Sequence, residues 1–235
     1  MITSKMGTLS LGNNKIRTNL LLIVCKLLVM LGALFIVAHL VPGINNYLLF
    51  QDIQISKDAV PYSLYLNYDS FFAGLVILYF NFQIKSHSNY EIKRSIKIGV
   101  IFGITSVVIL IIVSLILGFI RWDFKLTYIA LIFVFQNLIF TCFYEEVIWR
   151  GFIQKNLVQY TNALTGIILT ALLFAVAHIQ FAGINFAILA FIAAILYGSC
   201  YYFSKNKIES SIVCHYLVNI THFIFFTYPI LETAL

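Results

Sequence analysis

The chain has 235 residues, of which 61% are apolar and only 10% are charged, whereas a soluble domain carries roughly 25% charged residues. A soluble protein of this length needs more polar side chains to cover its surface, so the composition excludes a soluble globular fold. It also excludes a disordered chain, which is poor in apolar residues. With three prolines and no Gly- or Ser-rich tract, the chain has no obvious linker, and we expect one membrane domain.

Seven apolar segments approach the length of about 20 residues that a transmembrane helix needs. They are residues 20–41, 63–84, 98–120, 126 to about 144, 163 to about 180, 184–203 and 210–230. The third is the clearest because it has no charge in 23 residues, and the second is the weakest because Asp69 interrupts it. The sequence therefore predicts an all-α, polytopic bundle of about seven transmembrane helices in the cell membrane.

The basic residues predict how this bundle is oriented. If the N-terminus is cytoplasmic, 11 basic residues fall on the cytoplasmic side, and only Lys57, Arg121 and Lys125 fall on the outer side. Cytoplasmic loops are enriched in Lys and Arg, so we predict an N-terminus inside and a C-terminus outside. The net charge of +6 is then explained by membrane orientation, and we expect no nucleic acid partner.

Charged side chains are costly inside a bilayer and are functional candidates by default. The first such cluster holds Glu145, Glu146 and Arg150 in the stretch FYEEVIWRGF, which continues the fourth span. On a helix, Glu146 and Arg150 are four residues apart and can pair, while Glu145 is turned about 100° away. Taken alone, this cluster is equally well explained as a charge pair that ends a helix.

Two further clusters hold histidines. Phe174 and His178 end the fifth span in FAVAH, and His215 and Asn219 share one face of the seventh span in HYLVN. A lone histidine at a helix end is more often an interfacial residue than a catalyst, and Phe174 alone indicates only a core position. The pair on the seventh span needs partners, because an unpaired buried amide or imidazole costs a few kcal/mol. His222 could extend that face, but we expect it to be structural.

Taken together, the patterns EExxxR, FxxxH and HxxxN resemble the CPBP family of intramembrane proteases, also called Abi. This family groups CAAX prenyl endopeptidases with bacteriocin-processing and self-immunity proteins. All three patterns are intact and in order, and the resemblance covers roughly residues 124–227. The N-terminal half resembles the family only in being hydrophobic. The expected division is a cytoplasmic tail at 1–19, N-terminal transmembrane helices at 20–120 and a CPBP-like catalytic core at 121–235.

The resemblance implies a role for each motif residue. Glu145 would act as general base on a water that His178 binds and activates, and His215 and Asn219 would stabilise the oxyanion of the tetrahedral intermediate. Three further positions would support the site: Glu146, Arg150 and Phe174. Arg150 would hold Glu146 in place.

The resemblance leaves open whether the mechanism uses a metal. Glu145, His178 and His215 could ligate zinc and leave a fourth position for water. The zinc signature HExxH is absent, however, and we favour a mechanism without a cofactor.

The spacing also predicts how two of these residues meet. Glu145 and His178 are equally far along the chain from the polar turn at residues 159–162. An antiparallel helical hairpin folded at that turn would bring them to the same height.

The expected function is an intramembrane endopeptidase that hydrolyses a membrane-associated peptide or protein. Pheromone or bacteriocin processing and CAAX-type cleavage are the candidate reactions. The alternative is a noncatalytic bacteriocin self-immunity or scaffold protein, which would bind a partner membrane protein and use the motif residues structurally. A small transporter is a third possibility, but no internal repeat or pair of broken helices supports it.

Overall fold

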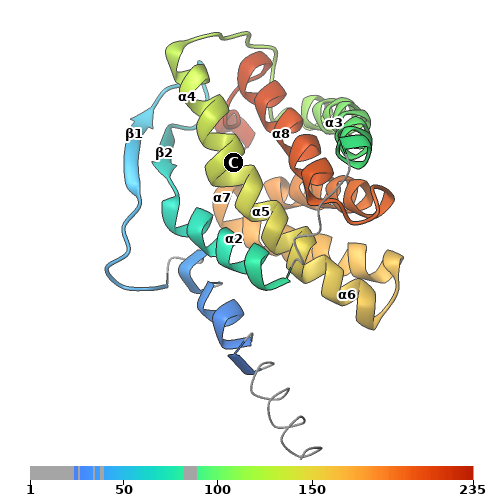
Figure 1. Cartoon of the computed structure of the whole chain (residues 1–235). Helices are drawn as coiled ribbons and strands as arrows, with labels where there is room; N and C mark the ends of the chain where they lie inside the picture. Colours follow the sequence, from blue (N-terminus) through green and yellow to red (C-terminus); the bar gives the residue numbers. More distant parts are fainter. Residues whose placement is uncertain (1–23, 26, 34, 38–39, 82–88, 235) are drawn as a thin grey trace, which may run out of the picture.

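The computed structural model describes residues 24–25, 27–33, 35–37, 40–81 and 89–234, and Figure 1 shows a helical bundle with one small sheet. The predicted tail at 1–19 lies outside the described residues. The elements are β1 (Tyr47–Ile53), β2 (Tyr62–Leu66), α2 (Tyr68–Asn81), α3 (Asn89–Ile116), α4 (Tyr128–Asn137), the π-helix η1 (Leu138–Cys142), α5 (Phe143–Glu146), the π-helix η2 (Val147–Gln154), α6 (Lys155–Tyr160), α7 (Ala163–Phe203), α8 (Ile208–Phe225) and the 3₁₀-helix η3 (Glu232–Ala234).

The expectation of a polytopic membrane bundle is confirmed. Four described helices are long and apolar enough to cross a membrane: Tyr90–Ile116, Tyr128–Tyr160, Ala163–Gln180 and Gly183–Phe203. Shorter apolar helices lie within Leu27–Val37 and Tyr68–Phe80, and α8 corresponds to the seventh predicted span. Each predicted span therefore contains a helix, and the orientation of the termini stays a prediction.

The second predicted span, residues 63–84, is wrong at its N-terminal end. Its first residues form β2, which pairs antiparallel with β1, and α2 starts only at Tyr68 and has 14 residues. Asp69 lies in the first turn of α2, where a carboxylate is stabilised by the positive end of the helix dipole. The charge that weakens this span therefore marks a helix start, and the apolar residues before it belong to a strand.

The helix α7 folds back on itself at Gly183. This residue has a φ of +75°, a left-handed conformation that glycine adopts without steric cost. The rings of His178 and Phe186 lie 6.1 Å apart across the bend. Phe174 of the first half is buried in one cluster with Ala190 and Ala194 of the second half. The two halves of α7 are thus antiparallel neighbours, as the separate predicted spans 163–180 and 184–203 require.

The seventh predicted span, 210–230, is too long at its C-terminal end, because α8 ends at Phe225. The chain beyond it is extended and forms isolated bridges from Phe226 to Trp122 and from Leu231 to Ala59. Segments that follow the first, third and seventh spans therefore meet at one end of the bundle. We call the assembly of residues 44–67, 119–126 and 226–234 the cap.

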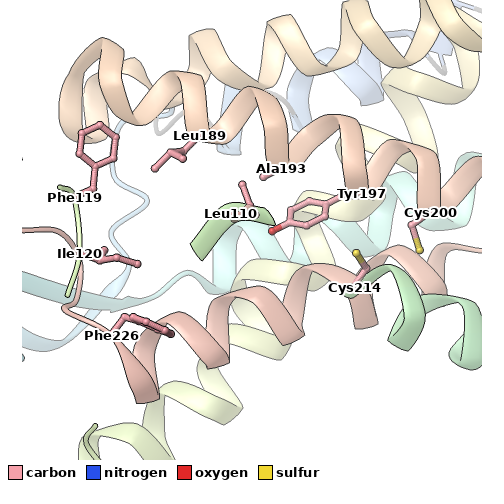
Figure 2. Packing of buried hydrophobic residues seen from close by; sticks show 9 residues of the cluster. All are labelled: Leu110, Phe119, Ile120, Leu189, Ala193, Tyr197, Cys200, Cys214 and Phe226. Atoms are coloured by element: carbon pink, nitrogen blue, oxygen red, sulfur yellow. The ribbon is translucent and has the colours of Figure 1, made fainter. Parts of the chain in front are cut away.

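Helices α3 and α8 pack closely because two glycines of α3 face α8. A Cβ atom added at Gly99 would lie 2.6 Å from the backbone oxygen of Ser210, and one at Gly103 would lie 2.7 Å from Leu217. Small residues spaced by four let helix backbones approach in this way. Next to this contact, Leu110 of α3, Tyr197 of α7 and Cys214 of α8 meet in one buried cluster (Figure 2).

We expect Gly99→Ala to lower the free energy of unfolding by about 1–3 kcal/mol, because the new methyl group must displace the backbone of α8. Gly32→Ala is the control, since nothing lies within 4 Å of a Cβ atom there. Thermal unfolding of the purified protein in detergent measures both. Equal midpoints for the two variants would contradict close packing of α3 on α8.

Candidate functional site

The glutamate pair lies in a continuous helical rod, Tyr128–Tyr160, that contains two π-helical stretches. In these stretches the backbone bonds to the fifth preceding carbonyl, as from the N–H of Phe143 to Leu138 and from that of Lys155 to Arg150. π-Helical insertions are rare in proteins, and those that occur often lie at functional sites. Here they flank α5, the four-residue segment that carries Glu145 and Glu146.

Glu146 is the centre of a buried ionic network. Its Oε1 accepts hydrogen bonds from Nη1 of Arg150 at 2.9 Å and from Nδ1 of His215 at 2.9 Å. The side chains of Glu146 and Arg150 are both 0% exposed. Charges that are fully removed from water persist only when they are paired, so this network joins the rod to α8.

Arg150 also fixes the rod to α7. Its guanidinium lies 5.0 Å from the ring centre of Phe174 and 5.2 Å from that of Tyr197, so an aromatic ring of each half of α7 contacts it. Its Nη2 donates to the carbonyl of Ala194 at 3.4 Å. Contacts between a cation and aromatic rings are strongest where water is excluded, as it is here.

Gln154, one turn beyond Arg150, also joins the rod to the second half of α7. Its Nε2 donates to the carbonyl of Gly198 at 2.9 Å, and its side chain is buried. Position 198 must be small, because a Cβ atom there would lie 2.6 Å from the Oε1 atom of Gln154. Gln154 is not among the residues predicted from the sequence, although its spacing of four residues from Arg150 indicates the same face of the helix.

Glu145 faces a different direction from its neighbour. It lines a cavity of about 480 Å³, whereas Glu146 does not. The same cavity is lined by His178 from α7 and by His215 and Asn219 from α8. The structure thus brings the four residues with predicted catalytic roles to one space, from three separate helical segments. No direct hydrogen bond joins Glu145 to His178 in the part of the chain that the structure describes.

His178 is oriented by its own helix. Its Nδ1 lies 2.7 Å from the carbonyl oxygen of Phe174, and the two rings stack at 4.1 Å. A carbonyl only accepts, so Nδ1 carries the proton, and Nε2 of the neutral ring is left as an acceptor. Phe174 therefore has two functions, because it orients His178 and packs on Arg150.

His215 and Asn219 are also held by partners. The ring of His215 stacks on Tyr197 at 4.7 Å while its Nδ1 is bound to Glu146. Asn219 donates from Nδ2 to Oδ1 of Asn137 at 3.2 Å, and the same oxygen accepts from the thiol of Cys142 at 3.1 Å. Asn137 is not among the residues predicted from the sequence, although a polar residue within a predicted span is a functional candidate.

His222 lies on the wall of this cavity, but its ring nitrogen Nε2 bonds the carbonyl of Thr227 at 3.0 Å. Its ring lies 5.1 Å from that of Tyr228 in the cap. His222 therefore ties the end of α8 to the cap, which agrees with the expected structural role.

A second, apolar cavity of about 140 Å³ adjoins the first and shares His178, His215 and Asn219 with it. Residues of α3 and of the second half of α7 line it, among them Leu110, Leu189, Ala193 and Tyr197 (Figure 2). The cavity that holds Glu145 thus lies beside a smaller and more apolar one, and the imidazoles of His178 and His215 line both.

The described residues do not form a metal site. No three His, Cys, Asp or Glu side chains within the described ranges are close enough to hold one ion. His215 directs its Nδ1 at Glu146, and the Nδ1 of His178 is bound to a backbone carbonyl. Both contacts leave Nε2 as the ring nitrogen that could take a metal, as in many metal-ligating histidines, so the bonds of Nδ1 do not separate the two mechanisms. The mechanism without a cofactor stays a prediction.

One comparison with known proteins gives a match. Residues 126–221 match the family model described as type II CAAX prenyl endopeptidase Rce1-like. This segment contains every residue of the three motifs. The curated proteins and the solved structures give no match. The match confirms the resemblance that the motifs predicted.

The ionic network predicts a specific pattern of stability. Arg150→Met alone leaves Glu146 charged and buried without its main partner, and we expect a loss of about 3–5 kcal/mol. The double variant Glu146→Gln, Arg150→Met removes both charges and should unfold at a higher temperature than Arg150→Met. Thermal unfolding in detergent measures this coupling. Additive losses in the double variant would contradict a direct pair.

Proposed function

Because residues 126–221 of this chain belong to the CPBP family of intramembrane proteases, we propose that the protein is an endopeptidase of the cell membrane. It hydrolyses a membrane-associated peptide or membrane protein. The observation that carries the proposal is the shared cavity of about 480 Å³, which Glu145, His178, His215 and Asn219 line together. A base, a water-binding imidazole and hydrogen-bond donors in one enclosed space are what peptide hydrolysis requires.

The reaction begins with a water between Glu145 and His178. The carboxylate of Glu145 takes a proton from the water, while the free Nε2 of His178 accepts the other hydrogen and holds the water in place. The water oxygen attacks the carbonyl carbon of the scissile peptide bond. This step forms a tetrahedral intermediate whose oxygen carries the negative charge.

Asn219 and His215 receive that charge. The Nδ2 of Asn219 has two hydrogens: it donates to Oδ1 of Asn137 at 3.2 Å and to Sγ of Cys142 at 3.7 Å, and the oxyanion would replace the sulfur, which is a weak acceptor. Nδ1 of His215 is bound to Glu146, so the ring can donate to the oxyanion only through Nε2, and only with a second proton on the ring. Glu145 then returns its proton to the leaving amine as the C–N bond breaks, which yields one carboxylic acid and one amine.

Glu146 and Arg150 serve this chemistry without contact with substrate. Arg150 pairs with Glu146 within the rod, and the bond from Glu146 to Nδ1 of His215 joins α5 to α8 and sets the ring plane of His215. A carboxylate on one ring nitrogen is a common way to orient a histidine that acts through the other nitrogen.

Substitution of the proposed base gives the first test. We expect Glu145→Gln to lower cleavage of a membrane-associated peptide substrate by at least about 100-fold, because the amide cannot accept the proton from water. His178→Ala should cause a similar loss. Glu232→Gln, which removes an exposed carboxylate of η3, is the matched control. Expression and thermal unfolding establish that each variant is folded. Immunity to a bacteriocin that survives both cavity substitutions would support a noncatalytic protein instead, and cleavage that survives them would exclude Glu145 and His178 as the catalytic groups.

The oxyanion donor gives a second test. Asn219→Ala should lower kcat by about 10²–10³-fold with a much smaller change in KM, because the bond strengthens only as charge develops on the substrate oxygen. Steady-state kinetics on a cleaved peptide separate the two constants. A rise in KM at unchanged kcat would assign Asn219 to substrate binding.

A further inference from the structure

The wall of the cavity opposite the helices is a strand edge. Residues 60–65 and Asn67 all line the cavity that holds Glu145. Successive side chains of a strand point to opposite faces, so one face of β2 could offer only every second residue. Within β2 the cavity touches four residues in a row, from Tyr62 to Tyr65, and it therefore lies along the backbone edge of the strand.

This edge has no strand partner in the described structure. The sheet has two strands, β1 pairs with one edge of β2, and no other described strand pairs with the second edge. In Figure 1, β1 is the outer strand and β2 lies between it and the helices. Pro61 has no N–H, so the edge that can pair through both its donors and acceptors begins at Tyr62.

A side-chain amide already occupies part of this edge. Gln136 of α4 donates from Nε2 to the backbone oxygen of Tyr65 at 2.9 Å, as the peptide group of a third strand would. The side chain of Gln136 is 95% buried and lines the cavity, and its Oε1 has no hydrogen-bond partner among the described residues. A buried acceptor without a partner costs about 1–3 kcal/mol, unless a ligand supplies the donor.

The occupant must also suit the chemistry beside it. In a helix the N–H and C=O groups of each peptide bond are bonded within the helix, whereas an extended chain presents them to its surroundings. Pairing with an exposed strand edge binds a peptide through its main chain with little dependence on sequence. The edge of β2 and Glu145 face the same space, so a chain paired there passes beside the proposed base.

We propose that the substrate binds in extended form as an added strand along β2, with a backbone N–H of the substrate donating to Oε1 of Gln136. This inference rests on the proposed function for the identity of the ligand as a substrate. Its binding step can be measured without cleavage.

The test uses Glu145→Gln protein in detergent and a fluorescein-labelled peptide of four Thr-Val pairs flanked by lysines. Two further peptides carry four N-methyl groups each. One has them on every second residue, which blocks a single edge, and the other has them on adjacent pairs, which blocks both edges. We expect the first to bind within about threefold of the unmodified peptide and the second to bind at least tenfold more weakly, by fluorescence anisotropy.

Equal binding of the two methylated peptides would overturn the proposal, because they carry the same number of methyl groups and differ only in whether one edge or both edges are blocked. Absence of binding by the unmodified peptide would overturn it as well. Neither result bears on whether Glu145 is required for hydrolysis, so failure of this binding mode and failure of the proposed protease are distinguished.

A variant of the protein tests the role of Gln136. Gln136→Met keeps the length of the side chain and removes both polar atoms, and it should weaken the unmodified peptide about tenfold. Thr141→Val is the matched control, since it changes a polar side chain of η1 on the same cavity and keeps the bond from Gln136 to Tyr65. Unchanged affinity in Gln136→Met would remove Gln136 from the binding site.

Discussion

The bond between Glu146 and Arg150 sets the geometry of the remaining site. It places two opposite charges where neither touches water, and such a pair is tolerated only if its other contacts are also in place. Those contacts are the aromatic rings of Phe174 and Tyr197, the carbonyl of Ala194 and the imidazole of His215. The rod, both halves of α7 and α8 therefore meet at a single ion pair. Glu145 reaches the cavity because its neighbour is held in this way.

The sequence contained enough to predict most of this arrangement. Scarcity of charge identified a membrane bundle, and the spacing of four residues in Glu146 and Arg150 predicted their pairing, which the structure contains. The predicted hairpin at residues 159–162 agrees with Asn162, whose side chain caps the start of α7. Glu145 and His178 lie on one cavity, as their equal distance from that turn requires.

Other features could not be predicted from the sequence. The two π-helical stretches carry no residue type that distinguishes them from an α-helix, since they differ only in which carbonyl each N–H reaches. Apolar content alone did not separate β2 from α2, because a short run of Tyr and Leu suits either a strand or a buried helix. The partner of Asn219 was missed for a different reason. Asn137 is far from Asn219 in sequence, and only the packing of the rod on α8 brings their amides together.

In the proposed protease, the place of the cap in the cavity wall separates substrate binding from chemistry along the chain. The segment that matches the protease family begins at residue 126, but residues 60–67 line the same cavity and come from the hairpin ahead of it. The charged network contacts none of those residues directly. In the proposed protease, a change in the length or edge of the hairpin should therefore alter which chains bind and leave Glu145 and His178 in place.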